Sequence, residues 1–374
     1  MRIGVPTEIK PSENRVGLTP ASVREVSSHG HDVIVQSGAG QAIGLTDDDY
    51  QQAGATIVAS VQEVFAAGEL IVKVKEPQPV ELGFLEERHT LFTYLHLAPA
   101  ATLTQRLAEI GCAAIAYETV TDKNGRLPLL APMSEVAGRM SVQVGAHCLE
   151  LEQGGRGILL GGVPGTSPAK VAVLGGGVVG ANAARFALGL EADVTVVDIS
   201  HDTLAALDIH YGPALNTLFS TAAAIEQLVL EADLVIGGVL VPGDQTPMLV
   251  SEELVRQMKT GAVIVDVAID QGGCVATSRP TTHADPYYEA HGVVHYCVAN
   301  MPGGVARTSA FALNNATLPF TLALADKGVK RALADDKHLR EGLNVYAGAV
   351  TFEAVANSTG TSYTPAAQAL GLYH

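Results

Sequence analysis

The sharpest local signal in this chain is the stretch Val171-Ala-Val-Leu-Gly175-Gly-Gly177-Val-Val-Gly180-Ala-Asn. An apolar run leads into its three spaced glycines, and an alanine-rich run of helical character, residues 178–190, follows them. In a strand, turn and helix of this kind, Gly175 permits the tight turn, Gly177 lets the backbone approach a pyrophosphate, and Gly180 lets helix and strand pack closely. Free N–H groups at the start of the helix attract the phosphates. We therefore predict a dinucleotide site here.

The next apolar run supports this prediction, because it ends in an acid. Asp198 follows residues 193–197 and lies 18 residues after Gly180. A carboxylate there accepts hydrogen bonds from the ribose hydroxyls of the adenosine and repels a 2′-phosphate. No Arg or Lys occurs in residues 199–203, so we expect NAD rather than NADP. The alternative is a glycine turn that binds nothing, with Asp198 as a helix cap.

Short apolar runs recur along both halves of the chain. They span residues 2–6, 32–36, 70–74, 91–95, 113–117, 171–174, 193–197, 234–239, 262–267 and 293–298. Helical stretches lie between most of them; one starts at Thr19-Pro20 and stops at Gly30, and another starts with the capping-box spacing Ser60 to Glu63 and stops at Gly68. Strands that alternate with helices predict parallel sheets with crossover helices, an α/β fold.

The remaining segments are less regular. We predict a helix over residues 134–150 that connects the two domains. The glycine-rich residues 154–165 fit a hinge, a subunit contact or a mobile loop. We predict helix again over residues 310–324 and 343–356. The C-terminal segment of about 70 residues is too small to form a hydrophobic core of its own, so we expect it to pack on the first domain.

Composition excludes several classes of protein. The 374 residues carry a net charge of −16, which disfavours nucleic acid as a partner. No apolar run is long enough to span a membrane, and the N-terminus does not read as a signal peptide. The four cysteines lack CxxC spacing, and no His/Asp/Glu cluster has metal-ligand spacing, so we expect neither a disulfide framework, a metal site nor an oxidising compartment. A cytoplasmic protein fits best.

Four charged residues follow predicted strands, where ligands of parallel sheets bind: Arg15, Lys75, His96 and Asp270. They suit amino-acid oxidation, in which Cα loses a hydride and nitrogen loses a proton. Histidine exchanges protons near neutral pH. Arginine and lysine hold a carboxylate, and an acid orients water or an ammonium group.

Each of the four also has a plain structural alternative. His96 can be a polar residue at a strand end whose hydrogen bonds are all made within the protein. Lys75 can form a solvent-exposed ion pair with the next residue, Glu76. Arg15 can be a surface residue near Glu13, and Asp270 can cap the turn before two glycines. The pattern of strands and helices alone does not bring the four residues together, because they come from both halves of the chain.

Six blocks of sequence resemble the L-alanine dehydrogenases, and the similarity covers essentially the whole chain. The blocks are residues 1–20, Val72-Lys-Val-Lys75-Glu-Pro, Leu91-Phe-Thr-Tyr-Leu-His96-Leu-Ala, residues 132–140, Asp266-Val-Ala-Ile-Asp270-Gln-Gly-Gly and residues 300–309. The resemblance implies NAD-dependent, reversible deamination of L-alanine to pyruvate and ammonia. It implies two Rossmann-like, doubly wound domains, with the NAD domain (129–304) inserted into a substrate domain (1–128 and 305–374). It also implies a homo-oligomer, commonly a hexamer.

The resemblance further implies roles for single residues. Arg15 and Lys75 would hold the substrate carboxylate, His96 would be the general acid/base, and Asp270 would be the second catalytic residue. NAD would be bound by Ser134, Gly175, Gly177, Val178, Val179, Gly180, Asp198, Ser220, Val239, Leu240, Val267, Ala268, Ile269, Asp270, Arg279, Val298, Asn300 and Met301. One departure is visible, since the family often has a basic residue where this chain has Thr203.

Three other functions remain open at this point. The NAD-binding component of proton-pumping transhydrogenase shares the opening motif and passes hydride to another protein. Saccharopine-type dehydrogenases and non-catalytic NAD-binding proteins are more distant possibilities. Turnover with alanine separates these classes.

Overall fold

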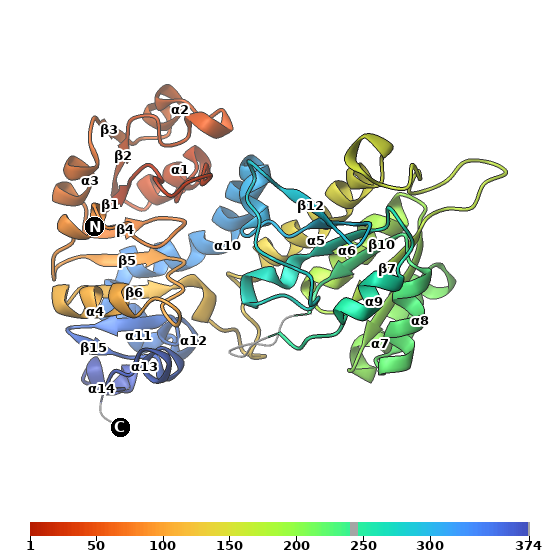
Figure 1. Ribbon diagram of the computed structural model, residues 1–374. Coiled ribbons are helices and arrows are strands. Elements are labelled where there is room, and N and C mark those ends of the chain that lie inside the picture. The colour runs from red at the N-terminus through yellow and green to blue at the C-terminus, as the bar shows by residue number, and fades with distance from the viewer. Residues whose placement is uncertain (240–245, 373–374) are drawn as a thin grey trace. The chain divides into compact units, whose positions relative to one another are not determined.

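The chain folds into two compact α/β units, seen in a computed structural model that describes residues 1–239 and 246–372 (Figure 1). Unit 1 comprises Met1–Met133 and Val305–His374, and unit 2 comprises Ser134–Gly304. In sequence, unit 2 is therefore inserted into unit 1. Helix α5 (Ala131–Cys148) carries the chain across the boundary between them.

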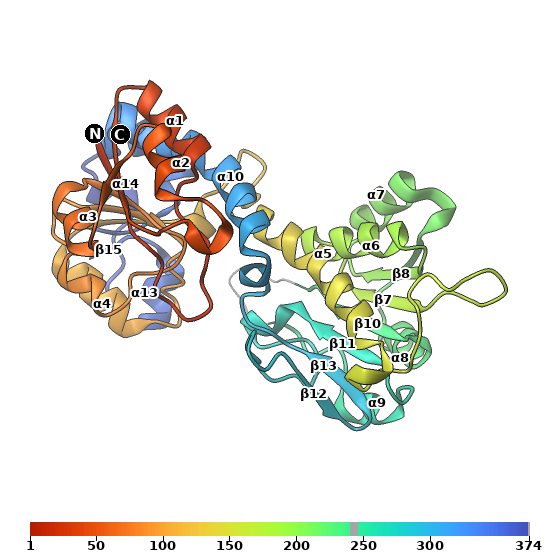
Figure 2. The ribbon, with the colours of Figure 1, turned by 90° about the horizontal axis from the view of Figure 1, so that it is seen from above.

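Unit 1 is built on an eight-stranded sheet in the order β15-β14-β6-β5-β4-β1-β2-β3. Its elements are β1 (Arg2–Val5), α1 (Pro20–Ser28), β2 (Asp32–Gln36), α2 (Asp47–Gln52), β3 (Thr56–Val58), α3 (Val61–Ala67), β4 (Leu70–Val72), β5 (Thr90–Thr93), α4 (Ala101–Ile110), β6 (Ala113–Ala116), α10 (Ala306–Lys327), α11 (Val329–Asp335), α12 (Lys337–Arg340), β14 (Leu343–Tyr346), β15 (Ala349–Val350), α13 (Glu353–Thr359) and α14 (Ala366–Ala369). Strands β1 to β6 are parallel. Helices α3, α4 and α13 share one apolar core with this sheet, while α1 packs against α10 (Figure 2).

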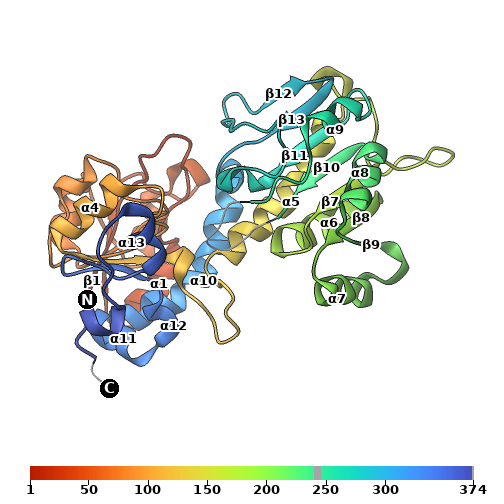
Figure 3. The same cartoon turned by 60° about the horizontal axis from the view of Figure 1, so that its bottom comes forward.

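Unit 2 is built on a seven-stranded sheet in the order β12-β13-β11-β10-β7-β8-β9. Its elements are β7 (Lys170–Leu174), α6 (Val178–Gly189), β8 (Asp193–Asp198), α7 (His201–Tyr211), β9 (Asn216–Phe219), α8 (Ala222–Glu231), β10 (Leu234–Gly237), α9 (Glu252–Gln257), β11 (Val263–Asp266), β12 (Tyr287–Ala290) and β13 (Val293–Tyr296). Only β12 runs antiparallel among these described strands. The prediction of an α/β protein with two largely parallel, doubly wound sheets is thus confirmed (Figure 3).

Local sequence signals set many of the element boundaries. Thr19 caps α1 by accepting the Ser22 N–H, and proline occupies the first helical position. Ser60 and Glu63 form the predicted capping box of α3, and each satisfies a backbone N–H of the other. Each predicted apolar run forms a strand in the structure, and its first and last residues differ from the predicted ones by at most two positions. The short strands β3, β9 and β12 were missed, because they are partly exposed and lack an uninterrupted apolar run.

The helix predicted over residues 343–356 is wrong. This segment forms the hairpin β14–β15, and only its end enters the short helix α13. Ala347 and Gly348, with φ of 48° and 86°, reverse the chain in the left-handed region, which no α-helix contains. Strand β14 pairs antiparallel with β6, so the C-terminal segment extends the sheet of unit 1.

Residues 154–165 form turns outside any regular element, and Leu159 and Val163 are exposed there. This is the extended loop between α5 and β7 in Figure 3. In the described part of the chain, no helix is long and apolar enough to cross a membrane.

Candidate functional site

The glycine turn after β7 has the geometry that its sequence predicts. Gly175 has φ of 93°, in the left-handed region. A Cβ on Gly180 would lie 1.7 Å from the carbonyl oxygen of Gly175, so only glycine lets α6 approach the strand this closely. A Cβ on Gly177 would meet no atom within 4 Å. The turn is therefore packed at Gly180 and open at Gly177, as a pyrophosphate cradle requires.

Asp198 anchors this turn at the end of β8. Its Oδ2 accepts the Gly176 N–H at 2.6 Å, and its Oδ1 accepts the Ser200 N–H at 2.7 Å. Ser200, not Asp198, caps helix α7, so the interpretation of Asp198 as a cap is wrong. The Ser220 N–H donates to the Asp198 carbonyl at 3.0 Å, which places this predicted cofactor residue beside the acid.

Other predicted cofactor residues line the same turn. Val178 and Val179 begin α6, with Val178 exposed, and Val239 lies 3.0 Å from where a Gly175 Cβ would stand. Thr203 packs in the same way, 2.8 Å from the Cβ position of Gly176. Leu240 lies outside the described residues.

A second group in unit 2 gathers after β11. The short 3-10 turn Val267–Gln271 leaves Asp270 exposed while Ala268 and Ile269 are buried. The Asn300 N–H donates to Asp270 Oδ1 at 3.3 Å, and Asn300 adopts φ of 62°. Asp270 therefore forms a hydrogen bond with the segment after β13 and does not act only as a turn cap.

Four further candidates belong to unit 2. Val298 and Met301 are buried. The Arg279 guanidinium stacks 4.1 Å from the centroid of the Tyr288 ring. Ser134, in the first turn of α5, is partly buried. Among the described residues, no hydrogen bond joins these side chains to the glycine turn.

In unit 1, Arg15 is buried and its guanidinium forms an ion pair within the protein. Only 2% of it is exposed, which contradicts the surface alternative. Glu13 accepts from Arg15 Nε at 2.7 Å and from Nη2 at 2.6 Å, a bidentate pair, while Nη1 donates to the sulfur of Met133 at 3.0 Å. This pair lowers the pKa of Glu13 against the opposing effect of burial.

Lys75 differs from Arg15 in that its ammonium group has no hydrogen bond or ion pair with any described residue. Glu76, its predicted partner, instead accepts from Lys10 Nζ at 2.5 Å. Burial, helped by the nearby cations Arg15 and Lys10, lowers the pKa of Lys75 below its usual 10.5. A partly buried ammonium group that no described residue pairs with is well suited to an anionic ligand.

His96 is held in a strained backbone conformation at the end of the β5 segment. Its φ is 48°, which few non-glycine residues adopt. The Glu118 carboxylate, after β6, accepts the His96 N–H at 2.6 Å and also approaches His96 Nδ1 at 3.9 Å. The imidazole stacks on the Tyr94 ring with an interplanar angle of 5°, and 46% of the side chain is exposed. These contacts aim an accessible imidazole from a fixed backbone.

A buried ionic cluster lies beneath Lys75. Lys73 Nζ donates to Glu81 Oε1 at 2.8 Å and to Glu8 Oε2 at 3.2 Å. Glu8 Oε1 also accepts the Val74 N–H at 2.6 Å. Burial raises the pKa of Glu8. The cluster fixes the strand end from which Lys75 projects.

Sequence reasoning named Glu13 only as a surface neighbour of Arg15, and it missed Glu8, Tyr94 and Glu118 as partners. Two signals were available: Glu13 stands two residues before Arg15, and Glu118 follows β6, which neighbours β5 in a parallel sheet. Carboxyl ends of neighbouring parallel strands meet at one edge.

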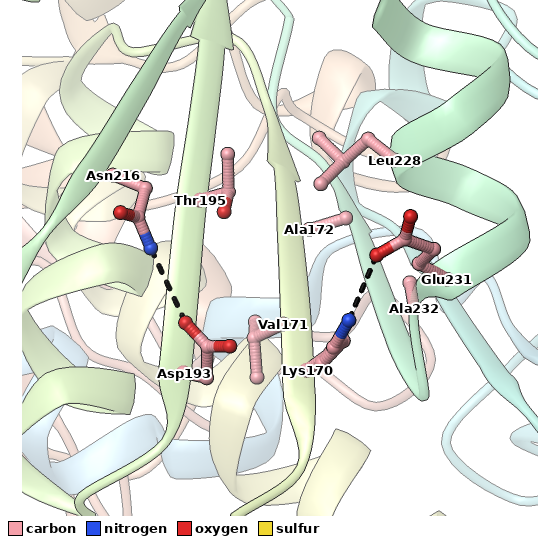
Figure 4. A pocket seen from close by; sticks show the side chains of 9 residues that line it. All are labelled: Lys170, Val171, Ala172, Asp193, Thr195, Asn216, Leu228, Glu231 and Ala232. Carbon is pink, nitrogen blue, oxygen red and sulfur yellow. Dashed lines mark hydrogen bonds and ion pairs between the residues drawn. The ribbon is translucent and has the colours of Figure 1, made fainter.

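One small pocket in unit 2 belongs to the other end of the sheet. It has a volume of about 130 Å³ and is lined by residues that include Lys170 and Asp193, the first residues of β7 and β8 (Figure 4). Lys170 pairs there with Glu231 at 2.8 Å, and Asn216 donates to Asp193 at 3.2 Å. The glycine turn follows the carboxyl end of β7, so this pocket is not part of the nucleotide site.

Comparison with known proteins agrees with this geometry. Residues 4–137 match the family model "Alanine dehydrogenase/PNT, N-terminal domain", and residues 141–353 match "Alanine dehydrogenase/PNT, C-terminal domain". The chain is 58% identical to an alanine dehydrogenase of Halomonas elongata and 55% identical to one of Bacillus subtilis. These alignments cover 99% of this chain, and 100% and 98% of the two relatives, respectively.

Solved structures give the same relationship. A structure titled L-alanine dehydrogenase superposes with a TM-score of 0.94 at 53% identity, covering 96% of this chain and 99% of the other. A transhydrogenase from Sinorhizobium meliloti superposes with a TM-score of 0.79 at 23% identity, covering 95% of this chain and 100% of the other, and so shares the fold. The chain belongs to the alanine dehydrogenase/PNT family.

Proposed function

We propose that this protein is an NAD-dependent L-alanine dehydrogenase, which converts L-alanine, water and NAD⁺ into pyruvate, ammonium, NADH and a proton. The observation that carries the proposal is the similarity to curated alanine dehydrogenases along nearly the whole chain, at 50–58% identity. The transhydrogenase alternative is not favoured, because that likeness reaches only 23% identity.

The residues of unit 2 fit a dinucleotide. Gly175, Gly177 and Gly180 leave room for a pyrophosphate, and the N-terminus of α6 supplies N–H groups to it. The Asp198 carboxylate would accept from the ribose and disfavour a 2′-phosphate, which supports NAD over NADP. When bound, the nicotinamide accepts the hydride of the substrate Cα. We assign the remaining predicted cofactor residues to the same role.

Two cations of unit 1 would hold the substrate carboxylate. Lys75 offers a partly buried ammonium group that forms no ion pair with any described side chain, so it would supply the main charge. Arg15, which Glu13 orients, would supply directed N–H donors. Fixing the carboxylate limits the motion of the Cα–H bond, which is a large part of the rate enhancement in such sites.

His96 would move the protons. It would accept a proton as the amine is oxidised to the imine, help water add to that carbon, and return a proton to nitrogen as ammonia leaves. Glu118 and Tyr94 hold the imidazole for this task. Asp270 would orient the water and the departing ammonium group.

Formation of NADH from L-alanine and NAD⁺, followed by its absorbance, tests the proposal. Signal with alanine and NAD⁺, but not with NADP⁺, with lysine or without substrate, is the expected result. A folded protein that binds NADH yet gives no signal in either direction would overturn it in favour of a hydride-transferring or regulatory protein.

We also propose a cytoplasmic homo-oligomer, as the family resemblance implies, with the hexamer as its expected form. The four free cysteines, all buried, agree with a reducing compartment: Cys112, Cys148, Cys274 and Cys297. Light scattering coupled to size exclusion measures the oligomeric state.

A further inference from the structure

The cations around the Lys75 ammonium group are all paired with carboxylates. Arg15 is paired with Glu13 in bidentate geometry, and Lys10 with Glu76 at 2.5 Å. Lys73 is paired with two buried carboxylates, Glu8 and Glu81, which outnumber it, so this cluster supplies no positive charge to a ligand. Of these four cations, Lys75 is therefore the one whose ammonium group forms no ion pair or hydrogen bond with any described residue.

This arrangement gives Glu13 a specific role. We propose that Glu13 determines charge selectivity: by neutralising Arg15, it leaves the three groups at the anion site, Arg15, Glu13 and Lys75, with one net positive charge, which matches a monocarboxylate and discriminates against a dicarboxylate. The inference rests on the proposed function, since it takes Arg15 and Lys75 as the groups that bind substrate.

The physical reason is the cost of an unbalanced charge in a buried place. The side chains of Arg15 and Glu13 are 1% and 0% exposed, so water screens their charges little. A ligand of charge −1 balances Lys75, whereas a ligand of charge −2 leaves one buried negative charge without a partner. Without Glu13, the site would carry two positive charges and would favour the second ligand.

Glu13 also restricts the geometry of Arg15. It occupies the Nε and Nη2 edge of the guanidinium, the edge that would otherwise form a fork with a ligand carboxylate. Arg15 then serves the ligand as a directed donor, while Lys75 supplies the net charge. A single carboxylate on the substrate satisfies both groups.

Oxamate and oxalate test the proposal, because they are close to pyruvate in size and differ from each other by one unit of charge. Their dissociation constants are measured by titration calorimetry with NADH present. Wild-type protein should bind oxamate more tightly than oxalate. Glu13→Gln should shift the ratio of the two constants toward oxalate by about tenfold or more. Wild-type protein that binds oxalate as tightly as oxamate would overturn the proposal.

Glu81→Gln is the matched control. It also removes a buried carboxylate of unit 1, but this one bonds to Lys73 and to the Gln78 N–H, not to Arg15 or Lys75. The ratio should stay within about threefold of wild type. An equal shift in Glu13→Gln and Glu81→Gln would show that general loss of charge, not Glu13, is responsible.

A double variant keeps the test valid if Glu13→Gln does not fold. Glu13→Gln with Arg15→Met removes both charges of the pair, a change that buried pairs often tolerate. Affinity should fall for both ligands, but the preference for oxamate should remain; a switch to oxalate would overturn the proposal. Absence of alanine turnover in wild type would refute the proposed function. Normal turnover, together with a ratio of oxamate and oxalate dissociation constants that Glu13→Gln does not change, would refute only the role of Glu13.

Discussion

Glu118 accepts the backbone N–H of His96 at 2.6 Å and thereby stabilises a residue whose φ of 48° is otherwise unfavourable. The same carboxylate accepts the Leu95 N–H at 3.2 Å. The orientation of the imidazole thus depends on a residue from the end of a neighbouring strand, 22 positions later in the sequence. Activity should depend on Glu118 although it need not touch the substrate.

Glu118→Ala should lower kcat at least about tenfold, because small displacements of a catalytic group are costly. The Kd for NADH should not change, since the glycine turn lies in unit 2. Glu109→Ala removes an exposed carboxylate that pairs with Arg106 and serves as the control. A Glu118→Ala protein with wild-type kcat would remove Glu118 from the positioning of His96.

His96→Ala should lose most turnover and retain NADH binding, because the imidazole carries the proton transfers. His147 is a suitable comparison: it is exposed and pairs with Glu150 on the surface of unit 2. His147→Ala should match wild type in steady-state assays. Unchanged turnover in His96→Ala would exclude His96 from the mechanism.

Asp198→Ala should raise the KM for NAD⁺ about tenfold and narrow the preference for NAD⁺ over NADP⁺. The variant loses the acceptor for the ribose and the repulsion of a 2′-phosphate, as well as the bonds to the Gly176 and Ser200 N–H groups. Asp193 starts the same strand and bonds only to Asn216 among the described side chains. Asp193→Ala should leave cofactor choice intact; the same effect in both variants would argue against a ribose contact.

Gly180→Ala should destabilise the protein strongly, because its Cβ would lie 1.7 Å from the Gly175 carbonyl oxygen. Gly189 ends the same helix, and a Cβ there would meet nothing within 4 Å. Gly189→Ala should raise the free energy of unfolding by about 0.5–1 kcal/mol. Thermal unfolding measures both, and equal melting temperatures for the two variants would contradict the close approach of α6 and β7.

Affinity for oxamate should fall as pH rises. Only the charged ammonium group attracts the ligand, and burial lowers the pKa of Lys75, so the charge is lost below the usual 10.5. Above that lowered pKa, Kd should increase about tenfold per pH unit. Lys75→Arg keeps its charge and should remove this dependence. A constant Kd up to pH 10.5 in wild type would show that Lys75 does not supply the charge.

Local features of the fold were predictable because neighbouring residues encode them. The glycine spacing after residue 174, the cap at Thr19 and the capping box at Ser60 act over a few positions, and the structure confirms all three. The hairpin at residues 343–350 was not predictable in this way. Its apolar residues suit a helix as well as a strand, and pairing with β6 selected the strand.

Local sequence patterns sufficed to place most of the strands, the glycine turn and the residue types at the strand ends, but not the short strands β3, β9 and β12 or the hairpin β14–β15. The partners of the charged residues depend instead on tertiary packing. Glu13 forms a buried pair with Arg15, Glu76 pairs with Lys10 rather than with Lys75, and Glu118 accepts the His96 N–H. Such pairings depend on strand order, register and burial. These arise when distant segments pack together, so no local pattern of residues specifies them.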